Sequence, residues 1–278
     1  MPADQDTGAL DLDAYLSRVQ WSGERVANAD TLRSVHRAHL LHIPFENGDA
    51  MVGSPPSLAL PDLERKLVRS ARGGYCYEHN TLLATALRAF GFHVTYLAAR
   101  VRVSQPGTGG VRPRTHMTLL VRVPGSETPY LADVGFGTTA LLEAVPLLAD
   151  TEWDRGAWKL RLVREPGGGS DDLWVLQVHS AGDEWSDLYA FSQEPFEPAD
   201  FMVANWYMAT HPRSPFHHRL VAQQPGIDTH RALFGRQLIH THGDGSVNKR
   251  ELTSAAEVLH TLATDFGIEL PAGTQLPA

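Results

Sequence analysis

The sequence predicts an α+β protein of three consecutive parts, and three observations lead to that prediction. Apolar residues recur at helical spacing over the first 91 residues, which is typical of a helical bundle. Between residues 92 and 195, short runs rich in Val, Leu and Tyr are separated by Gly and Pro turns, which indicates an antiparallel sheet or barrel. Residues 196–278 mix helical and strand patterns. No linker between the three predicted units 1–91, 92–195 and 196–278 is long or polar enough to separate independent domains.

The first part is expected to hold four helices, because its apolar residues follow a period near 3.6. The expected helices cover residues 11–21, 32–41, 62–70 and 76–90. Polar residues at 29–31 are expected to cap the second helix, and Gly91 to end the fourth.

Strands dominate the middle part. They are expected at residues 92–103, 116–123, 130–134, 158–163 and 173–179, with a Gly/Pro loop at 104–114 and a hairpin turn at 166–169. Because consecutive strands are joined by short turns, the sheet should be antiparallel.

The last part has a mixed pattern. Residues 195–209 suggest an irregular or helical crossover, 220–222 and 236–240 short strands, and 243–245 a hairpin turn. Ser254 and Glu257 form a capping-box pattern that opens a final helix ending at Phe266 and Gly267.

Composition limits the classes of partner and compartment. The chain has 278 residues, a net charge of −8 and no basic cluster, which argues against a nucleic-acid or anionic-membrane surface as its main partner. No apolar run approaches the roughly 18 residues of a membrane span, and the first residues do not resemble a signal peptide. A single cysteine cannot form an internal disulfide. We therefore expect a cytoplasmic protein.

The single cysteine, Cys76, stands where a glycine-rich turn meets the start of a helix. Gly73 and Gly74 interrupt any regular element before it, and the apolar spacing after it is helical. The free amides and positive dipole at a helix start favour a thiolate over a thiol. Cys76 is therefore a candidate nucleophile; the alternative is a small buried hydrophobic residue.

A thiolate nucleophile needs an imidazole to exchange its proton and an acid to orient that imidazole. His116 opens a predicted strand directly after the glycine-rich loop, and Asp133 follows an apolar run on the next strand. Residues on paired neighbouring strands can touch. The alternatives are a capped strand end for His116, a turn acid for Asp133, and His79, in the same helix as Cys76, as the base.

Other clusters carry weaker signals. His240 and His242 lie on one strand face, but no further ligand completes a metal set, so no metal site is predicted. Glycines at 107–110 lack a phosphate-binding context and suggest a flexible loop. His36, His39 and His42 recur every three residues and are expected to form a surface or partly buried stripe of one helix.

Four motifs together resemble the arylamine N-acetyltransferase family of the prokaryotic type. They are IPFEN at 43–47, RGGYCYEHN at 72–80, TH at 115–116 and ADVGFG at 132–137, in the family's order. The resemblance implies a helical bundle, an antiparallel β-barrel and a C-terminal α/β lid in a papain-like arrangement. It also implies that Cys76 accepts the acyl group, that His116 is its base and that Asp133 orients the base. Gly48 departs from the family's usual leucine, and we expect weaker packing there.

The activity that the resemblance implies is acetyl transfer from acetyl-CoA, through an acetyl-cysteine, to an arylamine or arylhydrazine in a ping-pong reaction. The partners would be coenzyme A and a small aromatic amine, with no metal, nucleic acid or membrane. Phe45 and Phe136, with Val101 and Phe216, would line the substrate pocket; the alternative is ordinary core. An amide synthase of the same fold, closing macrolactams in polyketide biosynthesis, would use the same three residues. A protein of another class, a non-catalytic ligand-binding or redox-sensing relative, would need the thiol but no proton shuttle.

Overall fold

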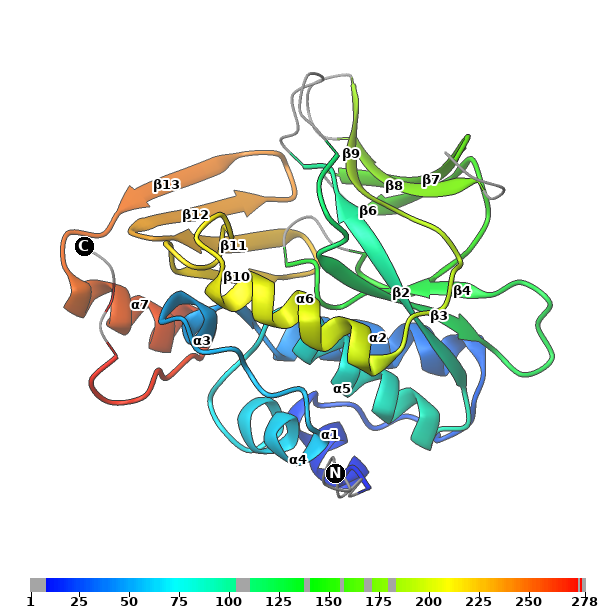
Figure 1. Ribbon diagram of the computed structural model, residues 1–278, viewed down its shortest axis with the longest axis horizontal. Helices are drawn as coiled ribbons and strands as arrows, with labels where there is room; N and C mark the ends of the chain where they lie inside the picture. Colours follow the sequence, from blue (N-terminus) through cyan, green and yellow to red (C-terminus); the bar gives the residue numbers. More distant parts are fainter. Residues whose placement is uncertain are drawn as a thin grey trace.

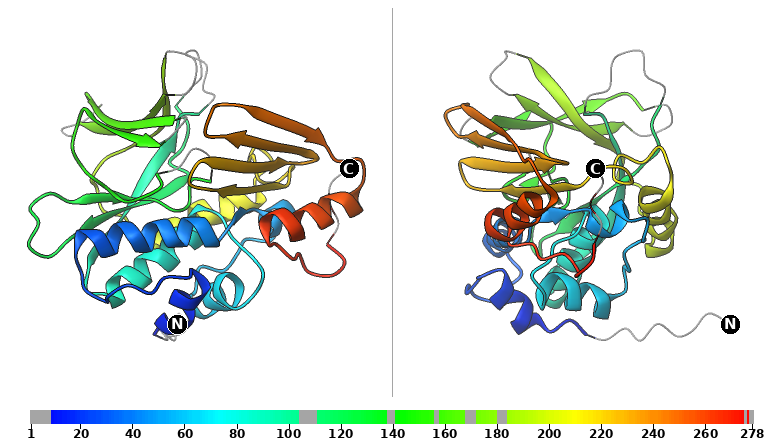
Figure 2. Two further views of the ribbon diagram at one scale, coloured as in Figure 1. Left: turned by 180° about the vertical axis from the view of Figure 1, so that it is seen from behind. Right: turned by 90° about the vertical axis from the view of Figure 1, so that its left-hand side faces the viewer.

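Helices from the first ninety residues form the base of the molecule in the computed structural model, which describes residues 9–103, 111–137, 141–155, 158–167, 172–179, 184–274 and 276. They are α1 (Leu12–Arg18), α2 (Ala29–His42), α3 (Gly48–Met51), α4 (Leu60–Leu63), a π-helical turn η1 (Glu64–Val68) and α5 (Cys76–Ala89). α2 and α5 run beneath the two sheets (Figures 1 and 2). The helical prediction for this part is confirmed.

The helices of this part differ from the prediction in their bounds, and α1 ends at Arg18 rather than at residue 21. α2 begins three residues earlier than expected because the Asn28 side chain accepts a hydrogen bond from the Thr31 amide at 2.8 Å. An asparagine oxygen satisfies one of the amides left free at a helix start, so Asn28 is the true cap. The single helix expected at 62–70 is instead the short α4 followed by η1.

Eight antiparallel strands form the larger sheet, in the order β5-β4-β3-β2-β9-β8-β7-β6. Their bounds are β2 (His93–Val101), β3 (His116–Arg122), β4 (Tyr130–Ala132), β5 (Val145–Pro146), β6 (Thr151–Arg155), β7 (Trp158–Glu165), β8 (Leu173–His179) and β9 (Trp185–Phe191). The sheet is strongly curled (Figure 1). Within the described ranges, however, β5 pairs only with β4 and β6 only with β7. The predicted barrel is therefore an open, half-closed sheet.

Both faces of the sheet are buried at β2, β3 and β4, which explains why these strands are almost continuously apolar. On β2, Val94 and Tyr96 pack into the core shared with the helices, while Leu97 and Ala99 face the core inside the curled sheet. Successive strand residues point to opposite faces, so one strand contributes to two cores. The sheet thus forms the middle layer between the helices and the second core.

The last part of the chain supplies a second sheet and two helices. α6 (Pro198–Thr210) crosses the front of the molecule, and α7 (Ala255–Phe266) packs beside the smaller sheet (Figure 1). That sheet has the order β1-β10-β11-β12-β13, with β1 (Phe45–Glu46), β10 (Val221–Pro225), β11 (Thr229–Phe234), β12 (Gln237–His242) and β13 (Val247–Glu251). The predicted crossover is the helix α6. The strands β1, β5, β6, β9, β11 and β13 were not predicted.

The helix-stop and capping signals near the end of the chain are confirmed with one change. Ser254 accepts from the Glu257 amide at 3.1 Å, and Gly267 ends α7 with a φ of 65°. The Glu257 carboxylate, however, accepts from the amide and hydroxyl of Thr253. The reciprocal half of the predicted capping box is therefore displaced by one residue.

Gly48 lies in a closely packed place, and the expectation of weak packing there is wrong. A Cβ added to Gly48 would lie 2.8 Å from Leu270 and 2.9 Å from the Glu46 carboxylate. A residue from the far end of the chain fills the space that a side chain at position 48 would take.

In the part of the chain that the structure describes, no helix is long and apolar enough to cross a membrane. The same residues contain no group of three His, Cys, Asp or Glu side chains placed to hold a metal ion. The division into units 1–91, 92–195 and 196–278 stays a prediction.

Candidate active site

Cys76 is the first residue of α5 and reaches a cavity of about 770 Å³ from below. The side chain is 4% exposed, and its Sγ lies 3.9 Å from the carbonyl oxygen of Thr115. The first amides of a helix have no partner within the helix, so the sulfur stands beside free donors. The thiol predicted at a helix start is therefore a buried thiol that faces a large cavity.

The two glycines before Cys76 are needed for close approach. A Cβ on Gly73 would lie 1.8 Å from the Pro44 carbonyl oxygen, and one on Gly74 would lie 2.7 Å from a carboxylate oxygen of Glu78. Neither glycine has a positive φ. The pair therefore lets the chain press against the 44–46 segment and against the first turn of α5.

His116 and Asp133 meet above the start of α5. His116 opens β3, Asp133 follows β4, and these two strands pair directly. The Nε2 of His116 lies 2.6 Å from Oδ2 of Asp133, and both side chains are buried. The placement predicted from two neighbouring strands thus brings the imidazole and the carboxylate into contact.

Besides His116, two donors hold the Asp133 carboxylate and one acceptor holds its amide. Its Oδ1 accepts from Asn80 Nδ2 and from the Gly135 amide, each at 3.0 Å, and its own amide donates to His36 Nε2 at 3.0 Å. The Asn80 side-chain oxygen accepts from the Val134 amide as well. Buried carboxylates need such donors because an unpaired charge is costly in the interior. The carboxylate is therefore fixed in position and orientation.

His116 and Asp133 each stabilise the charged form of the other. Burial alone lowers the pKa of His116, but the charge and hydrogen bond of Asp133, with a smaller contribution from Cys76, raise it to about 10. Burial alone would raise the pKa of Asp133, but His116, Asn80 and the Gly135 amide hold it below its usual range. At neutral pH the favoured state is an imidazolium beside a carboxylate. Since the two groups are coupled, the pair titrates as a unit.

The remaining nitrogen of His116 is left for Cys76. Nε2 is taken by Asp133, and Cys76 is a hydrogen-bond and charge partner of the same ring. The rings of Phe136 and Tyr189 enclose His116, with centroids at 5.1 and 5.0 Å. The imidazole therefore lies between the sulfur and the carboxylate.

The expected surface stripe of histidines is wrong for two of its three members. His36 and His39 have no exposed surface, while His42 is half-buried. His36 supports the Asp133 amide. His39 is hydrogen-bonded to Tyr15 and to His79, and the other nitrogen of His79 lies 3.1 Å from the Pro44 carbonyl. His79 is thus taken up by a buried network, and the imidazole that contacts the sulfur is that of His116.

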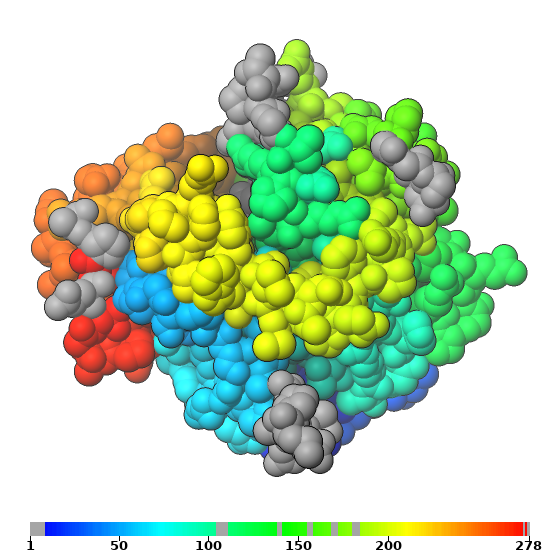
Figure 3. Space-filling view, viewed as in Figure 1, coloured from blue at the N-terminus to red at the C-terminus, as the bar shows by residue number. Residues whose placement is uncertain are grey.

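The four predicted pocket residues line one cavity. Phe45, Val101, Phe136 and Phe216 all contribute to its wall, together with Val103, Arg112, Pro113, Thr115, Tyr207, Met208, Arg213, Pro215, Gln223 and Phe234. α6 with the loop after it, in yellow, and the green segment that includes Val101 form neighbouring parts of this face (Figure 3). Apart from Phe216, the wall residues after Phe136 were not predicted, because they come from helix, loop and strand segments without a motif. Asn80 is the last residue of the RGGYCYEHN motif at 72–80, but no role was predicted for it.

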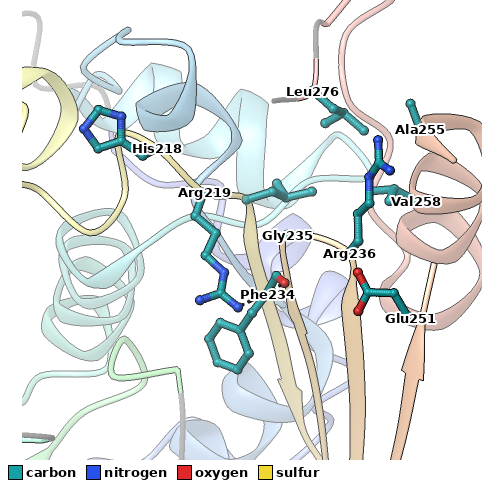
Figure 4. A pocket seen from close by; sticks show the side chains of 10 residues that line it. His218, Arg219, Phe234, Gly235, Arg236, Glu251, Ala255, Val258 and Leu276 are labelled. Atoms are coloured by element: carbon teal, nitrogen blue, oxygen red, sulfur yellow. Dashed lines mark hydrogen bonds between the residues drawn. The ribbon is translucent and has the colours of Figure 1, made fainter. Parts of the chain in front are cut away.

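A second cavity of about 330 Å³ lies between β11–β13 and α7 (Figure 4). Arg219 and Arg236 line it, with Glu251 on β13. Arg219 lies over the Phe234 ring at 5.2 Å and donates to its carbonyl. The lining residues of this second cavity include no cysteine, whereas Cys76 lines the larger cavity.

Comparison with known proteins shows the family of this chain. Residues 28–275 match the family model described as N-acetyltransferase. An arylamine N-acetyltransferase from Mycolicibacterium smegmatis is 38% identical over 263 residues, which are 94% of this chain and 93% of that protein. The chain belongs to the arylamine N-acetyltransferase family.

Solved structures of this family have the same fold. The arylamine N-acetyltransferase of Nocardia farcinica superimposes with a TM-score of 0.87 at 41% identity, covering 97% of this chain and 95% of that one. A Mycobacterium marinum arylamine N-acetyltransferase, in complex with CoA, gives a TM-score of 0.86 at 37% identity over 93% of both chains. Family membership supports an acetyltransferase activity, and the motif resemblance is confirmed.

Proposed function

We propose that this arylamine N-acetyltransferase moves an acetyl group from acetyl-CoA to the nitrogen of an arylamine or arylhydrazine through an acetyl-Cys76 intermediate. The observation that carries the proposal is the buried contact of His116 with Asp133, beside the only cysteine of the chain and under a cavity of about 770 Å³. A thiol on a helix start facing a histidine and an acid on two strands is also the papain-like layout that the motifs suggested.

In the first half-reaction the Cys76 sulfur attacks the thioester carbonyl carbon. A carbon–sulfur bond to Cys76 forms, the bond to the donor sulfur breaks, and His116 gives its proton to the leaving sulfur. Free amides at the start of α5 are positioned to stabilise the negative charge on the carbonyl oxygen. Asp133 keeps the imidazole in one orientation throughout.

In the second half-reaction the amine attacks the acetyl group on Cys76. The new carbon–nitrogen bond forms as the bond to the Cys76 sulfur breaks, and His116 accepts the proton that the amine loses. The ring returns to its imidazolium form beside the thiolate. Donor and acceptor use one cavity in turn, which gives ping-pong kinetics.

The cavity has one part suited to each substrate. Phe45, Phe136 and Phe216 provide flat apolar walls near Cys76, which fit the ring of an aromatic amine. Arg112 and Arg213, both exposed, line the same cavity. Guanidinium groups suit the phosphates of coenzyme A, the ligand in the Mycobacterium marinum complex.

Intact-mass measurement after mixing with acetyl-CoA tests the proposal. The protein should gain one acetyl group on the peptide that contains Cys76, and lose it when an arylamine is added. Cys76→Ser should gain none. His116→Ala should keep the thiol but acylate on the order of a thousandfold more slowly, as expected for one member of a coupled catalytic unit. An acetyl group on another residue, or normal acylation of His116→Ala, would contradict the mechanism.

A further inference from the structure

The Glu78 carboxylate is buried directly behind the nucleophile and takes no part in the mechanism above. Glu78 is the third residue of α5, and its side chain is 2% exposed. Its Oε2 accepts from the Tyr75 amide at 3.1 Å, and its Oε1 accepts from Lys66 Nζ at 2.7 Å. Tyr75 directly precedes Cys76. The carboxylate therefore holds the residue from which the nucleophile's helix begins.

Three carboxylates and two cations share this buried site. Lys66 on η1 also binds Asp49 of α3 at 2.7 Å and lies 4.0 Å from Glu46 of β1. Arg72 binds both Glu46 and Asp49, at 2.7 and 2.9 Å. With every group ionised the cluster carries one excess negative charge. Among the residues that the structure describes, Lys66 is the one cationic partner of Glu78, and Lys66 also pairs with Asp49 and Glu46.

An added proton on Glu78 competes with existing contacts. Each of its two oxygens already faces an N–H donor, so a proton on either oxygen competes with Lys66 or with the Tyr75 amide. Burial and the charges of Glu46 and Asp49 outweigh Lys66 and raise the pKa of Glu78 to about 7. The neutral and the ionised forms are therefore both accessible near neutral pH.

We propose that Glu78 is a positioning residue whose ionisation fixes the first turn of α5 and thereby sets the reactivity of Cys76 near neutral pH. The ionised form holds the Tyr75 amide by a charge-assisted hydrogen bond, which is stronger than one to a neutral acceptor. Lys66 offsets the charge of ionised Glu78. Ionisation of Glu78 therefore acts on Cys76 mainly by fixing the position of its sulfur. The link to acyl transfer rests on the proposed function, whereas the link to thiol reactivity does not.

Glu78→Gln tests the proposal because the amide mimics the protonated carboxyl. Glutamine offers one acceptor and one donor group, and it also removes the excess negative charge of the cluster. Alkylation of Cys76 by iodoacetamide is followed from pH 6 to 8 in both proteins. The ratio of the wild-type rate to the variant rate should be near one at pH 6 and rise about fivefold by pH 8, as expected when a bond to an ionised carboxylate replaces a neutral one. A ratio that does not change with pH overturns the proposal.

The unfolding equilibrium gives a second readout. A carboxyl whose folded pKa is raised contributes stability below its unfolded pKa and loses it as the pH rises through the folded value. The unfolding constant of the wild type, relative to that of Glu78→Gln, should therefore rise on the order of 100-fold between pH 5 and pH 8. A constant ratio contradicts the buried titration.

Two further variants separate positioning from general damage. Glu257→Gln is the matched control, because Glu257 accepts from the Thr253 amide before α7 in the same way, but its side chain is 29% exposed. The ratio of the wild-type alkylation rate to the rate of this variant should not change with pH. Lys66→Met removes the cation that pairs with Glu78, so Glu78 should ionise at a higher pH. The rise in the alkylation rate of Cys76 that depends on Glu78 should move to higher pH with it. If this rise stays at the wild-type pH, the proposal is overturned. This variant serves also if Glu78→Gln does not fold. Failure of acetyl-CoA to acylate Cys76 would refute the proposed function, while the alkylation and unfolding comparisons would still test Glu78.

Discussion

Close backbone approach at single glycines determines where the nucleophile lies. Gly135 is the clearest case, because an added Cβ would lie 2.6 Å from the Cys76 Cα and 2.8 Å from Asn80 Nδ2. The obstructing atom is backbone, which cannot rotate away. Gly135 thus sets the distance between the loop that follows Asp133 and the start of α5.

Gly135→Ala should displace Cys76 from His116 without removing any group that takes part in the reaction. Acylation of Cys76 should fall about 100-fold, as expected when a misplacement of about 1 Å reaches reacting atoms. The unfolding free energy should fall by about 1–3 kcal/mol from overpacking. Single-turnover acylation and urea unfolding measure the two effects.

Gly226→Ala is the control for this prediction. Its added Cβ would meet the Thr229 hydroxyl at 2.4 Å, and that side chain can rotate. Acylation should stay near the wild-type rate. A Gly135→Ala protein that acylates normally would show that the loop can move away from α5.

Residue types in the sequence were enough to select a thiol, an imidazole and an acid that the structure brings together, since the predicted chemistry needs these side chains. They did not show what supports Asp133. Asn80 and His36 contact it from 53 and 97 residues away in the chain, and neither separation follows a local period. Such partners become visible only when helices and strands are packed together.

Three helical segments of the base are joined by one chain of buried hydrogen bonds. The Pro44 carbonyl can only accept, so His79 Nε2 donates to it, and His79 Nδ1 must accept from His39 Nε2. His39 Nδ1 then accepts from the Tyr15 hydroxyl at 3.0 Å. Both imidazoles are neutral in this arrangement. The chain ties α1, α2 and α5 to the segment that carries Phe45, whose ring is stacked on His79.

This chain makes the base sensitive to acid. Burial lowers the pKa of His79 to about 4. The hydrogen bond to the Pro44 carbonyl opposes this shift, and the charge of Lys66 adds to it. The unfolded chain takes up a proton near pH 6.5, so stability is complete above that value and is lost as the pH falls toward 4. The loss from His79 alone is on the order of 3 kcal/mol. Burial lowers the pKa of His39 as well.

His79→Gln should weaken this dependence, because glutamine keeps one donor and one acceptor but does not titrate. Urea unfolding from pH 7 to pH 4.5 should show a smaller loss of free energy for the variant than for the wild type. Glu78 changes stability in the opposite direction over part of this range, but it is present in both proteins. Tyr15→Phe leaves His39 Nδ1 without its donor, so it should lower the unfolding free energy by about 1–3 kcal/mol at every pH. The dependence of its unfolding free energy on pH should be as steep as that of the wild type. Equal slopes for His79→Gln and wild type would contradict the neutral chain.

Elements with a strong local signal were predicted, and elements without one were not. α5 and α7 have apolar periodicity and recognisable ends, whereas β5 and β1 have two residues each and exist only through their partners. The curled sheet was predicted as a barrel because local patterns do not reveal whether edge strands meet. Closure depends on strand tilt and stagger across the whole sheet.

At the scale of the whole molecule, the first and last parts of the chain share a sheet. Phe45 pairs with Gln223 and Glu46 with Ala222, although 178 positions of the chain (223 − 45) separate Phe45 from Gln223. Gln224 donates to the carbonyls of Leu40 and Leu41 at the end of α2. The cavity above Cys76 lies where these parts meet the large sheet. We therefore expect units 1–91 and 196–278 to open together.

Asn47 is the strongest single link between these two units. It is 2% exposed, its Nδ2 donates to the carbonyls of Phe216 and Arg219, and its Oδ1 accepts from the Val221 amide at 2.7 Å. Asn47→Ala removes all three bonds and leaves buried backbone groups unpaired, so it should cost about 2–4 kcal/mol. Because the loss is at the junction, it should fall mainly on β10 and its neighbours.

Hydrogen exchange under native conditions checks this expectation. In the wild type, the amides of β10 and of α2 should exchange with similar free energies, since the two units open together. In Asn47→Ala, β10 should exchange faster while α2 and α5 keep their protection. Asn248→Ala, which removes only an exposed bond to His242 within the same sheet, should change neither. If β10 keeps its full protection in Asn47→Ala, the link lies elsewhere, and the contacts of Gln224 with the end of α2 are then what hold the last unit on the first.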